Sequence, residues 1–243
     1  TVDNNNTSVQ ALNAISAPLI DAFTYTFTDS SGLTTTNQIT ISIEGSNDAP
    51  IGANTTVDSP EDTPFVFTST DFGFSDLDSG DSLSSVRIDA LPASGSLTLT
   101  GSGAVSIGQV ISLADIVAGK LVFTPVADAN GDAYALIAFS VGDQANAYDG
   151  TPNTITIDIT PENDAPVLDN AGNTTLTTRT EDQTTNAGNT VASIIASAGG
   201  DRITDVDASP LEGIAITALS SGNGTWEYSI DGSTWNNIGV VSD

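Results

Sequence analysis

The chain has 243 residues, with 31 Asp and Glu against 4 Lys and Arg, a formal charge of -27, and no Cys, His or Met. Disulfides, thiolate nucleophiles and the usual histidine bases and zinc ligands are therefore excluded. With so few cations the chain cannot neutralise a run of phosphates, so we expect no nucleic-acid partner and no binding to anionic lipid. Because no stretch approaches roughly 18 consecutive apolar residues, membrane insertion is not expected either.

A period of two dominates the sequence, with apolar side chains alternating with Thr or Ser, as in a strand with one buried face. The pattern recurs in residues 23–27, 39–43, 97–99, 155–159 and 226–230. It predicts an all-β chain. One short helix is expected at residues 112–118, where Ser112 can cap the first turn, and residues 189–197 fit either a strand or a short helix.

An internal repeat organises the chain. Residues 39–51 (ITISIEGSNDAPI) and residues 155–167 (ITIDITPENDAPV) are two copies of one motif. Each copy follows a strand that ends in Asp, and each is followed by an acidic pair and then by a D-x-D sequence. The preceding strands are residues 25–29 and 139–143, the acidic pairs are Glu61-Asp62 and Glu181-Asp182, and the D-x-D sequences are residues 76–78 and 205–207.

These landmarks divide the chain into three predicted pieces. Residues 1–50 are the end of one unit, residues 51–166 are a complete unit, and residues 167–243 are the beginning of another. Pro50 and Pro166 close the two linkers and stiffen them, since proline fixes its own φ and restricts the residue before it.

Short motifs along the whole chain are VDNNN at 2–6, FTYTFTD at 23–29, NDAP at 47–50, EDTP at 61–64, FTP at 123–125, DANG at 128–131, TDVD at 204–207 and GTWEYS at 224–229. The first three resemble the C-terminal half of a VCBS repeat. The next three resemble the bacterial cadherin-like repeats of very large surface proteins, and the last two resemble the opening part of a further cadherin-like or VCBS-like repeat.

The resemblance implies a fold and a setting. The fold is a tandem array of Ig-like, cadherin-like Greek-key β-sandwiches joined by short calcium-binding linkers. The setting is a large secreted adhesin, similar to RTX adhesins, at the cell surface or in a biofilm. We therefore expect an extracellular spacer or adhesion repeat, with neighbouring repeats of the same chain as its partners and surface glycans or other cell-surface components as its targets.

The acidic residues predict where calcium binds, because the loops of a sandwich gather at its two poles. With the first strand at about residues 53–57, Glu61 and Asp62 fall in the turn after it. One pole of the middle piece is then expected to contain Glu61, Asp62, Asp128, Asn130 and Asp132, together with Asn163 and Asp164 of the linker and Asp205 and Asp207 of the next piece. The opposite pole is expected to contain Asn47, Asp48, Asp76, Asp78, Asp81 and Asp143.

Carboxylates brought so close together need a counter-charge, and four cationic side chains are too few to supply it. Calcium takes oxygen ligands from flexible loops of Asp, Glu and Asn and needs neither His nor Cys. We therefore expect Ca²⁺ at both linkers, with Asn47, Asp48, Asp76, Asp78 and Asp143 at the first and the acids of the opposite pole at the second. Asp and Asn also favour turns without any ion, which leaves solvated loops as the alternative.

A carbohydrate-binding module is a second functional alternative, because Trp226, Tyr228 and Trp235 lie in one segment and aromatic faces suit sugars. Trp226 and Tyr228 share one face of their strand with Ile230, however, and such a face is expected to be buried core. Trp235 follows a turn and is the better candidate for exposure.

A filament subunit and an enzyme are two further functional classes. Residues 1–50 and 167–243 together have about the length of one domain, so the tail of one chain could complete the head of the next and build a homo-oligomeric filament. The alternative is that the chain is an excerpt from a much longer repeat protein. An enzyme is not expected, because serine without histidine lacks its ordinary activating base. The paired carboxylates of a glycosidase also need one acid held protonated in an apolar pocket, whereas the acids here lie in loops rich in Gly and Ser.

Overall fold

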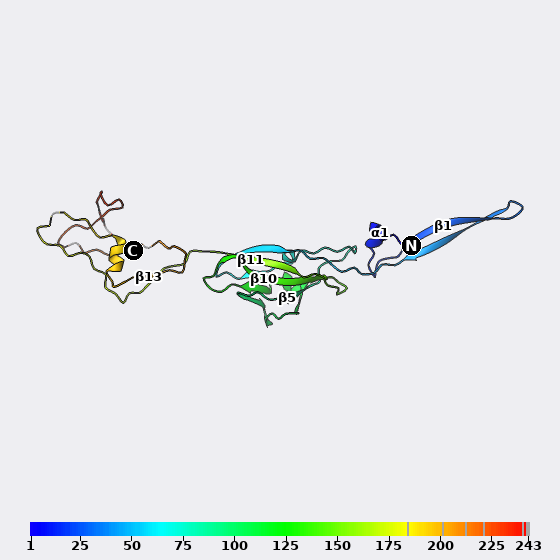
Figure 1. Cartoon of the computed structure of the whole chain (residues 1–243), viewed down its shortest axis with the longest axis horizontal. Helices are drawn as coiled ribbons and strands as arrows, with labels where there is room; N and C mark the ends of the chain where they lie inside the picture. The colour runs from blue at the N-terminus through cyan, green and yellow to red at the C-terminus, as the bar shows by residue number, and fades with distance from the viewer. Residues whose placement is uncertain (184, 201, 212, 221, 240, 242–243) are drawn as a thin grey trace. The chain divides into compact units, whose positions relative to one another are not determined.

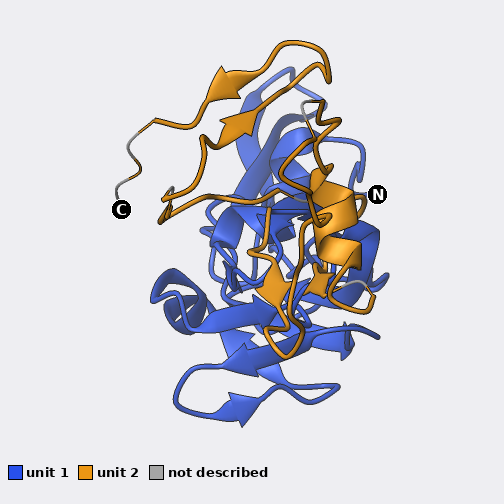
Figure 2. Cartoon of the chain, turned by 90° about the vertical axis from the view of Figure 1, so that its left-hand side faces the viewer, with its two compact units in different colours: residues 1–162 blue, residues 163–243 orange. Residues whose placement is uncertain are grey.

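The computed structural model describes residues 1–183, 185–200, 202–211, 213–220, 222–239 and 241. They divide into two compact units, Thr1–Glu162 and Asn163–Asp243, which Figure 2 colours separately. The first unit contains α1 (Thr7–Gln10), β1 (Leu19–Thr28), β2 (Thr34–Ile43), β3 (Thr55–Pro60), β4 (Phe65–Val66), the 3-10 helix η1 (Ser69–Phe72), β5 (Ser85–Ala90), β6 (Ser96–Leu99), β7 (Gly103–Ala104), β8 (Val110–Ser112), α2 (Leu113–Val117), β9 (Leu121–Thr124), β10 (Gly131–Gly142) and β11 (Asn153–Thr160). The second unit contains β12 (Val167–Leu168), α3 (Val191–Ala196), β13 (Ile203–Thr204), β14 (Glu227–Tyr228) and β15 (Asn236–Asn237).

The chain is all-β, as the period of two predicts, and its helices are single short turns (Figure 1). The helix expected at residues 112–118 is confirmed as α2, whose Ser112 hydroxyl accepts a hydrogen bond from the Asp115 N–H. The ambiguous segment at residues 189–197 forms the helix α3, capped by Thr190. Within the described ranges, no helix has the length and apolar character needed to cross a membrane.

Two sheets share the hydrophobic core of the first unit. One has the strand order β3-β11-β10-β5-β8, and the other has the order β4-β9-β6-β7. Every neighbouring pair is antiparallel except β3 and β11, which run parallel. Alternation along each strand sends one set of side chains inward. The core therefore combines Val86, Ile88, Ile137, Phe139, Ile155, Ile157 and Ile159 of the first sheet with Leu97, Leu99, Leu121 and Phe123 of the second.

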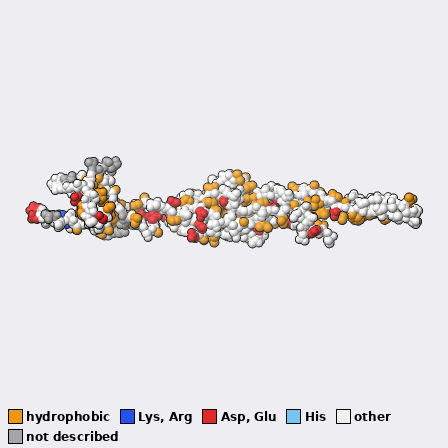
Figure 3. All heavy atoms as spheres, turned by 90° about the horizontal axis from the view of Figure 1, so that it is seen from above, with side chains coloured by type: hydrophobic (Ala, Val, Ile, Leu, Met, Phe, Trp, Pro, Cys, Tyr) orange, Lys and Arg blue, Asp and Glu red, His pale blue; other side chains and the backbone are white. Residues whose placement is uncertain are grey.

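The strands β1 and β2 form a two-stranded sheet of their own (Figure 1). Strands were predicted here, and the structure confirms them. The buried face that their alternation predicts is wrong for this hairpin, because Phe23, Phe27, Ile39 and Ile41 are exposed. Figure 3 shows hydrophobic side chains reaching the surface at this end of the first unit. A period of two shows that one face is apolar, but it does not show that a second sheet covers that face.

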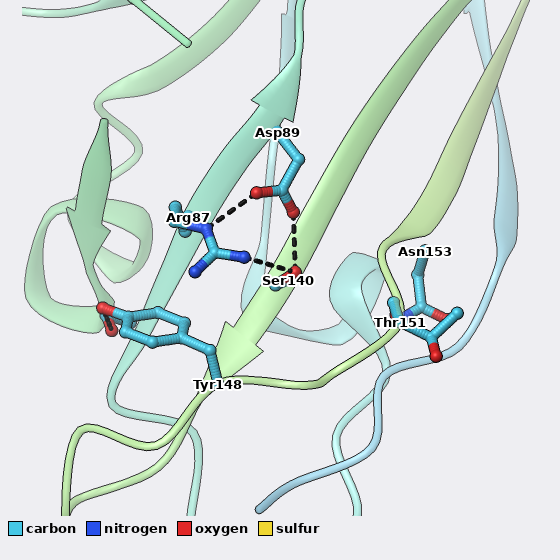
Figure 4. A network of polar contacts seen from close by, with 7 residues as sticks. Arg87, Asp89, Ser140, Tyr148, Thr151 and Asn153 are labelled. Atoms are coloured by element: carbon cyan, nitrogen blue, oxygen red, sulfur yellow. Dashed lines mark hydrogen bonds and ion pairs between the residues drawn. The ribbon is translucent and has the colours of Figure 1, made fainter. Parts of the chain in front are cut away.

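A polar network occupies the other face of the five-stranded sheet (Figure 4). Val86 and Ile88 of β5 point into the core, so Arg87 and Asp89 point to the opposite side. The Arg87 Nε donates to Asp89 Oδ1 at 2.7 Å, and its Nη2 donates to Ser140 Oγ at 3.1 Å. The Ser140 hydroxyl donates in turn to Asp89 Oδ2 at 2.6 Å. Arg87, one of the four cationic residues of the chain, is thereby fixed on this face of the sheet.

The second unit contains only short pairings within its described residues. β12 pairs with β13, and β14 pairs with β15, both antiparallel. The expectation that Trp226, Tyr228 and Ile230 form a buried face is wrong, because all three side chains are exposed. The strand β14 is only two residues long and pairs with another two-residue strand, so this segment has no broad sheet against which to pack. Trp235 is exposed to a similar degree as Trp226.

Candidate metal centre

Three carboxylates converge in the loop between η1 and β5. Oxygen atoms of Asp76, Asp78 and Asp81 all lie within 4.8 Å of one another. The loop is shaped locally by its own acids, since the Asp78 N–H donates to Asp76 Oδ1 at 2.9 Å and the Asp81 N–H donates to the Asp78 carbonyl. The first of these bonds forms an Asx turn, which favours Asp in a tight loop, and the second is a main-chain turn. Here, they also direct three negative side chains toward one point.

The three carboxylates have oxygen atoms that are buried and lack a hydrogen-bond donor. These atoms are Asp76 Oδ2, Asp78 Oδ1 and Asp81 Oδ2, and no residue that the structure describes donates to them. Asp78 is only 4% exposed. A buried polar atom without a partner is costly, and a buried charge is more costly still. The cluster therefore requires a proton, a water molecule or a cation to be satisfied.

The pKa of Asp78 also indicates that the cluster lacks a positive partner. Burial raises the pKa of its carboxyl, and the negative charges of Asp48, Asp76 and Asp81 raise the pKa further. The N–H of Asp48 opposes this rise by donating to Asp78 Oδ2 at 2.7 Å. Because the net direction is upward, the charged form of Asp78 is disfavoured in the fold unless another positive group approaches it.

The linker before β3 closes onto this loop. Besides the bond from Asp48 to Asp78, the Asn47 Nδ2 donates to the Asp48 carbonyl at 2.6 Å and to Asp143 Oδ2 at 2.8 Å. Asp143 is fully buried, and its Oδ1 accepts from the Ala147 N–H at 2.8 Å. The structure thus brings together all five residues that were expected at the first linker, although their role as ligands stays a prediction. The sequence-based set did not include Asp81 as a ligand, although the spacing D-x-D-x-x-D in residues 76–81 was the available signal.

Residues before the hairpin β1–β2 also contact the acidic loop. The Ser79 N–H donates to the Ala11 carbonyl at 3.0 Å, and the Asn13 Nδ2 donates to the Ser79 carbonyl at 3.3 Å. Gly45 lies against the same segment, because a Cβ at this position would come within 2.3 Å of the Asn13 carbonyl oxygen. The segment of residues 11–13, the linker and the loop of residues 76–81 therefore form one packed region around the carboxylates.

At the opposite pole of the first unit, the carboxylates of Glu61 and Asp62 accept hydrogen bonds. Glu61 is buried, and its two oxygens accept from the Glu162 N–H at 2.8 Å and from Asn130 Nδ2 at 2.9 Å. Asp62 Oδ1 accepts from the Asp128 N–H at 3.0 Å. The structure therefore joins the first turn to the turn of Asp128 and Asn130, as expected. Asp132 was expected in the same turn, but it lies in β10, because the strand already begins at Gly131.

The second unit repeats the geometry of the first linker. The Asn163 Nδ2 donates to the Asp164 carbonyl at 2.8 Å, as Asn47 does to Asp48. The Asp164 N–H donates to Asp207 Oδ2 at 2.9 Å, and the Asp207 N–H donates to Asp205 Oδ1 at 3.0 Å. We call this arrangement, an Asn-Asp linker bonded to the second acid of a D-x-D loop, the linker clasp. Among the described residues, each unit contains one linker clasp.

The donor atoms of the carboxylate cluster determine which ions it could bind. Asp76, Asp78 and Asp81 offer only carboxylate oxygens, which suit hard cations such as Ca²⁺, Mg²⁺ or Mn²⁺ rather than metals that prefer nitrogen or sulfur. No family model matches the chain, and no curated protein matches it at a significant level. A functional assignment therefore depends on the site itself.

Proposed function

We propose that the chain is a calcium-stiffened spacer from a large extracellular adhesion protein, in which calcium fixes the linkers between consecutive β-units. One observation carries the proposal. Three carboxylate oxygens of Asp76, Asp78 and Asp81 are buried together without a donor from any described residue, directly beside the linker that Asp78 holds through the Asp48 N–H.

Calcium suits this cluster better than the other hard cations. It accepts six to eight oxygens in variable geometry, so main-chain carbonyls and water can complete the shell around three Asp side chains. Magnesium demands a near-ideal octahedron and keeps most of its waters, which fits a buried group of carboxylates poorly. A divalent ion would also offset part of the -27 charge, which otherwise opposes compaction.

The mechanical role follows from what the carboxylates contact. Asp78 bonds the main chain of the linker, and Asn47 of the same linker bonds the buried Asp143 after β10. An ion bound by Asp76, Asp78 and Asp81 would hold the loop in the conformation that receives Asp48. Losing the ion would leave like charges buried together and would loosen the loop together with the linker.

The finer architecture and the cellular setting belong to the same proposal. The two sheets around one core are taken as an Ig-like, cadherin-like Greek-key sandwich, and the second linker clasp supports a tandem arrangement of such units. Extracellular modules that bind calcium through loops typically do so with dissociation constants of about 10⁻⁴ to 10⁻³ M. Sites with such affinities bind calcium outside the cell, where a surface or biofilm adhesin is located.

The test is a calcium titration of the full chain, monitored by calorimetry, thermal melting and small-angle scattering. We expect calcium to raise the Tm and reduce flexibility, with magnesium much less effective. The variant Asp78→Asn should weaken calcium binding at least roughly tenfold, since one charged ligand is lost. Asp58→Asn on the exposed side of β3 removes an equal charge as the matched control. Identical melting and scattering in calcium and in chelator would overturn the proposal.

A further inference from the structure

The main chain of the acidic loop is bonded to a segment that precedes the hairpin β1–β2. The Ser79 N–H donates to the Ala11 carbonyl at 3.0 Å, and the Asn13 Nδ2 donates to the Ser79 carbonyl at 3.3 Å. Both main-chain polar groups of Ser79 are therefore bonded to residues 11–13. Because Ser79 directly follows Asp78 in the chain, these bonds fix the main chain beside a carboxylate of the cluster.

Asp78 and Asp81 stand at the two ends of a turn whose own hydrogen bond is weak. The Asp81 N–H donates to the Asp78 carbonyl at 3.4 Å, which is longer than the usual range of roughly 2.7 to 3.2 Å. Gly80 within the turn has a φ of +91°, a left-handed conformation that glycine adopts readily. Since the closing bond is weak and glycine adds freedom, the turn depends on contacts from outside it. The two bonds to Ser79 are such contacts.

The Asn13 side chain is held in position by its own loop. It is 8% exposed, and its Oδ1 accepts from the Ile15 N–H at 3.1 Å and from the Ser16 hydroxyl at 2.8 Å. The Asn13 N–H donates to the oxygen of the same hydroxyl at 3.1 Å. With the amide oxygen occupied by two donors, the Nδ2 is the group that reaches Ser79. Asn13 thus presents a donor whose direction is already fixed, so the bond to Ser79 costs little additional side-chain entropy.

The linker leaves room for this segment because residue 45 is a glycine. A Cβ at Gly45 would clash with the main-chain carbonyl of Asn13, an atom that no side-chain rotation can move away. The segment of residues 11–13 therefore contacts both the linker and the acidic loop. The same linker and loop are joined directly by the bond from the Asp48 N–H to Asp78.

We propose that Asn13 is a positioning residue of the calcium site, so that a segment before the linker controls how tightly the loop of residues 76–81 binds calcium. The inference rests on the function proposed above. Asn13 fixes the Ser79 carbonyl, and the turn around Ser79 then keeps the two carboxylates at its ends converged with the third. Calcium bound to the converged cluster favours the docked segment in turn, because coupling between two binding events is reciprocal. In a tandem array, displacement of one piece would thereby weaken the calcium site that follows it.

The test is a calcium titration of the full chain by NMR, with the Ser79 amide resonance as the probe. Ser79 lies within the acidic loop, so its shift reports this site even when calcium binds elsewhere in the chain. We expect Asn13→Ala to raise the calcium dissociation constant of this site roughly threefold to tenfold, the fold-change that one hydrogen bond supplies. Gly45→Ala should raise it as well, because the added Cβ displaces the segment from the linker side.

Two substitutions serve as matched controls. Asn37→Ala removes an exposed Asn of β2 whose Oδ1 accepts from the neighbouring Gln38 N–H, and Gly150→Ala adds a Cβ in open space. Neither should change the calcium dissociation constant. Asn13 and Gly45 lie outside the core cluster of the first unit, so the core should fold in all four variants.

Thermal melting separates positioning from a purely structural role. Because calcium stabilises the fold in proportion to how tightly it binds, Asn13→Ala should lower the Tm more in excess calcium than in chelator. Equal losses in the two conditions would assign Asn13 a structural role and overturn the inference. An unchanged dissociation constant in Asn13→Ala, with a normal response of the wild-type chain, would also overturn this inference alone. A wild-type Ser79 amide that does not respond to calcium would overturn the proposed function and this inference with it.

Discussion

The main-chain N–H of Asp48 donates a hydrogen bond of 2.7 Å to the carboxylate of Asp78, which lies in a loop 30 residues further along the chain. The Asp78 carboxylate thereby holds the linker with one oxygen, while its other oxygen is buried and receives no hydrogen bond from the residues that the structure describes. The same bond recurs in the second unit between Asp164 and Asp207. Each linker is therefore attached to its unit through a carboxylate. In the first unit, the fold supplies hydrogen bonds to only one of the two oxygens of this carboxylate.

Asp78→Asn should change stability in opposite directions with and without calcium. The amide keeps an oxygen that can accept from Asp48 but removes a buried negative charge beside Asp76 and Asp81. In chelator, we expect the free energy of unfolding to rise by about 1 kcal/mol, because the repulsion among the carboxylates falls. In excess calcium, we expect it to fall below the wild-type value, because a ligand is lost.

Chemical denaturation in the two conditions measures both values. Asp58→Asn is the control for a simple change in net charge and should show no crossover. If Asp78→Asn destabilises the chain equally in calcium and in chelator, the carboxylate has a structural role and the ion does not bind there.

The location of this cluster could be predicted from sequence, whereas its hydrogen bonding could not. The repeated NDAP motif and the D-x-D loops indicate which segments occupy equivalent places, and the structure brings Asn47, Asp48 and Asp143 to the loop of Asp78. Whether a given acid is satisfied depends on which N–H groups reach it. Glu61 has donors on both oxygens, whereas Asp78 lacks one, and nothing in their local sequences distinguishes the two.

Truncating equivalent residues in the two hairpins should have unequal effects. Ile155→Ala opens a cavity in the shared core and should lower the free energy of unfolding by about 2 to 5 kcal/mol. Ile39→Ala removes the same atoms from an exposed face and should cost less than about 1 kcal/mol in dilute solution. Urea denaturation at low protein concentration measures both, and equal losses would show that the β1–β2 face is covered within the molecule.

Burial is the property that the sequence pattern predicted least well. Ile39 and Ile155 stand in nearly identical stretches, and both lie in strands as predicted. Only the strands of the second sheet, which are distant in sequence, make one of them core and leave the other exposed. The same holds for Trp226, whose alternating pattern predicts a buried face that the short pairing of β14 does not provide.

Arg87→Ala should destabilise the first unit although the side chain is partly exposed. The substitution removes the guanidinium that donates to both the fully buried Ser140 hydroxyl and the Asp89 carboxylate (Figure 4). It also removes the contact of the guanidinium with the Tyr148 ring, 4.9 Å from its centroid. We expect a loss of about 2 kcal/mol.

Lys120→Ala serves as the matched comparison for Arg87→Ala. Lys120 forms an ion pair with Asp115 at 2.7 Å, and its side chain is more exposed than that of Arg87. Exposed pairs of this kind contribute less than about 1 kcal/mol. Urea denaturation of both variants should therefore rank Arg87→Ala as the more damaging, and the reverse order would contradict a structural role for the network.

Asp149→Asn should lower stability at neutral pH but not in acid. Burial raises the pKa of Asp149, but hydrogen bonds from the Gly52 N–H, the Thr151 N–H and Asn153 Nδ2 outweigh it and leave the pKa below its ordinary value. A group whose folded pKa is depressed contributes stability above its unfolded pKa, and this contribution is lost as the pH falls through the folded pKa. An Asn side chain has only one oxygen to accept these bonds, and its NH2 group would face the remaining N–H donors.

We therefore expect Asp149→Asn to lower the free energy of unfolding by about 2 kcal/mol at pH 7. The deficit should shrink when denaturation is repeated at about pH 3, below the usual pKa of about 3.9 for an unfolded Asp, because the unfolded carboxyl then binds a proton more readily than the folded one. A deficit that stays constant between these two pH values would show that the charge of Asp149 is not what holds Gly52 to the loop after β10.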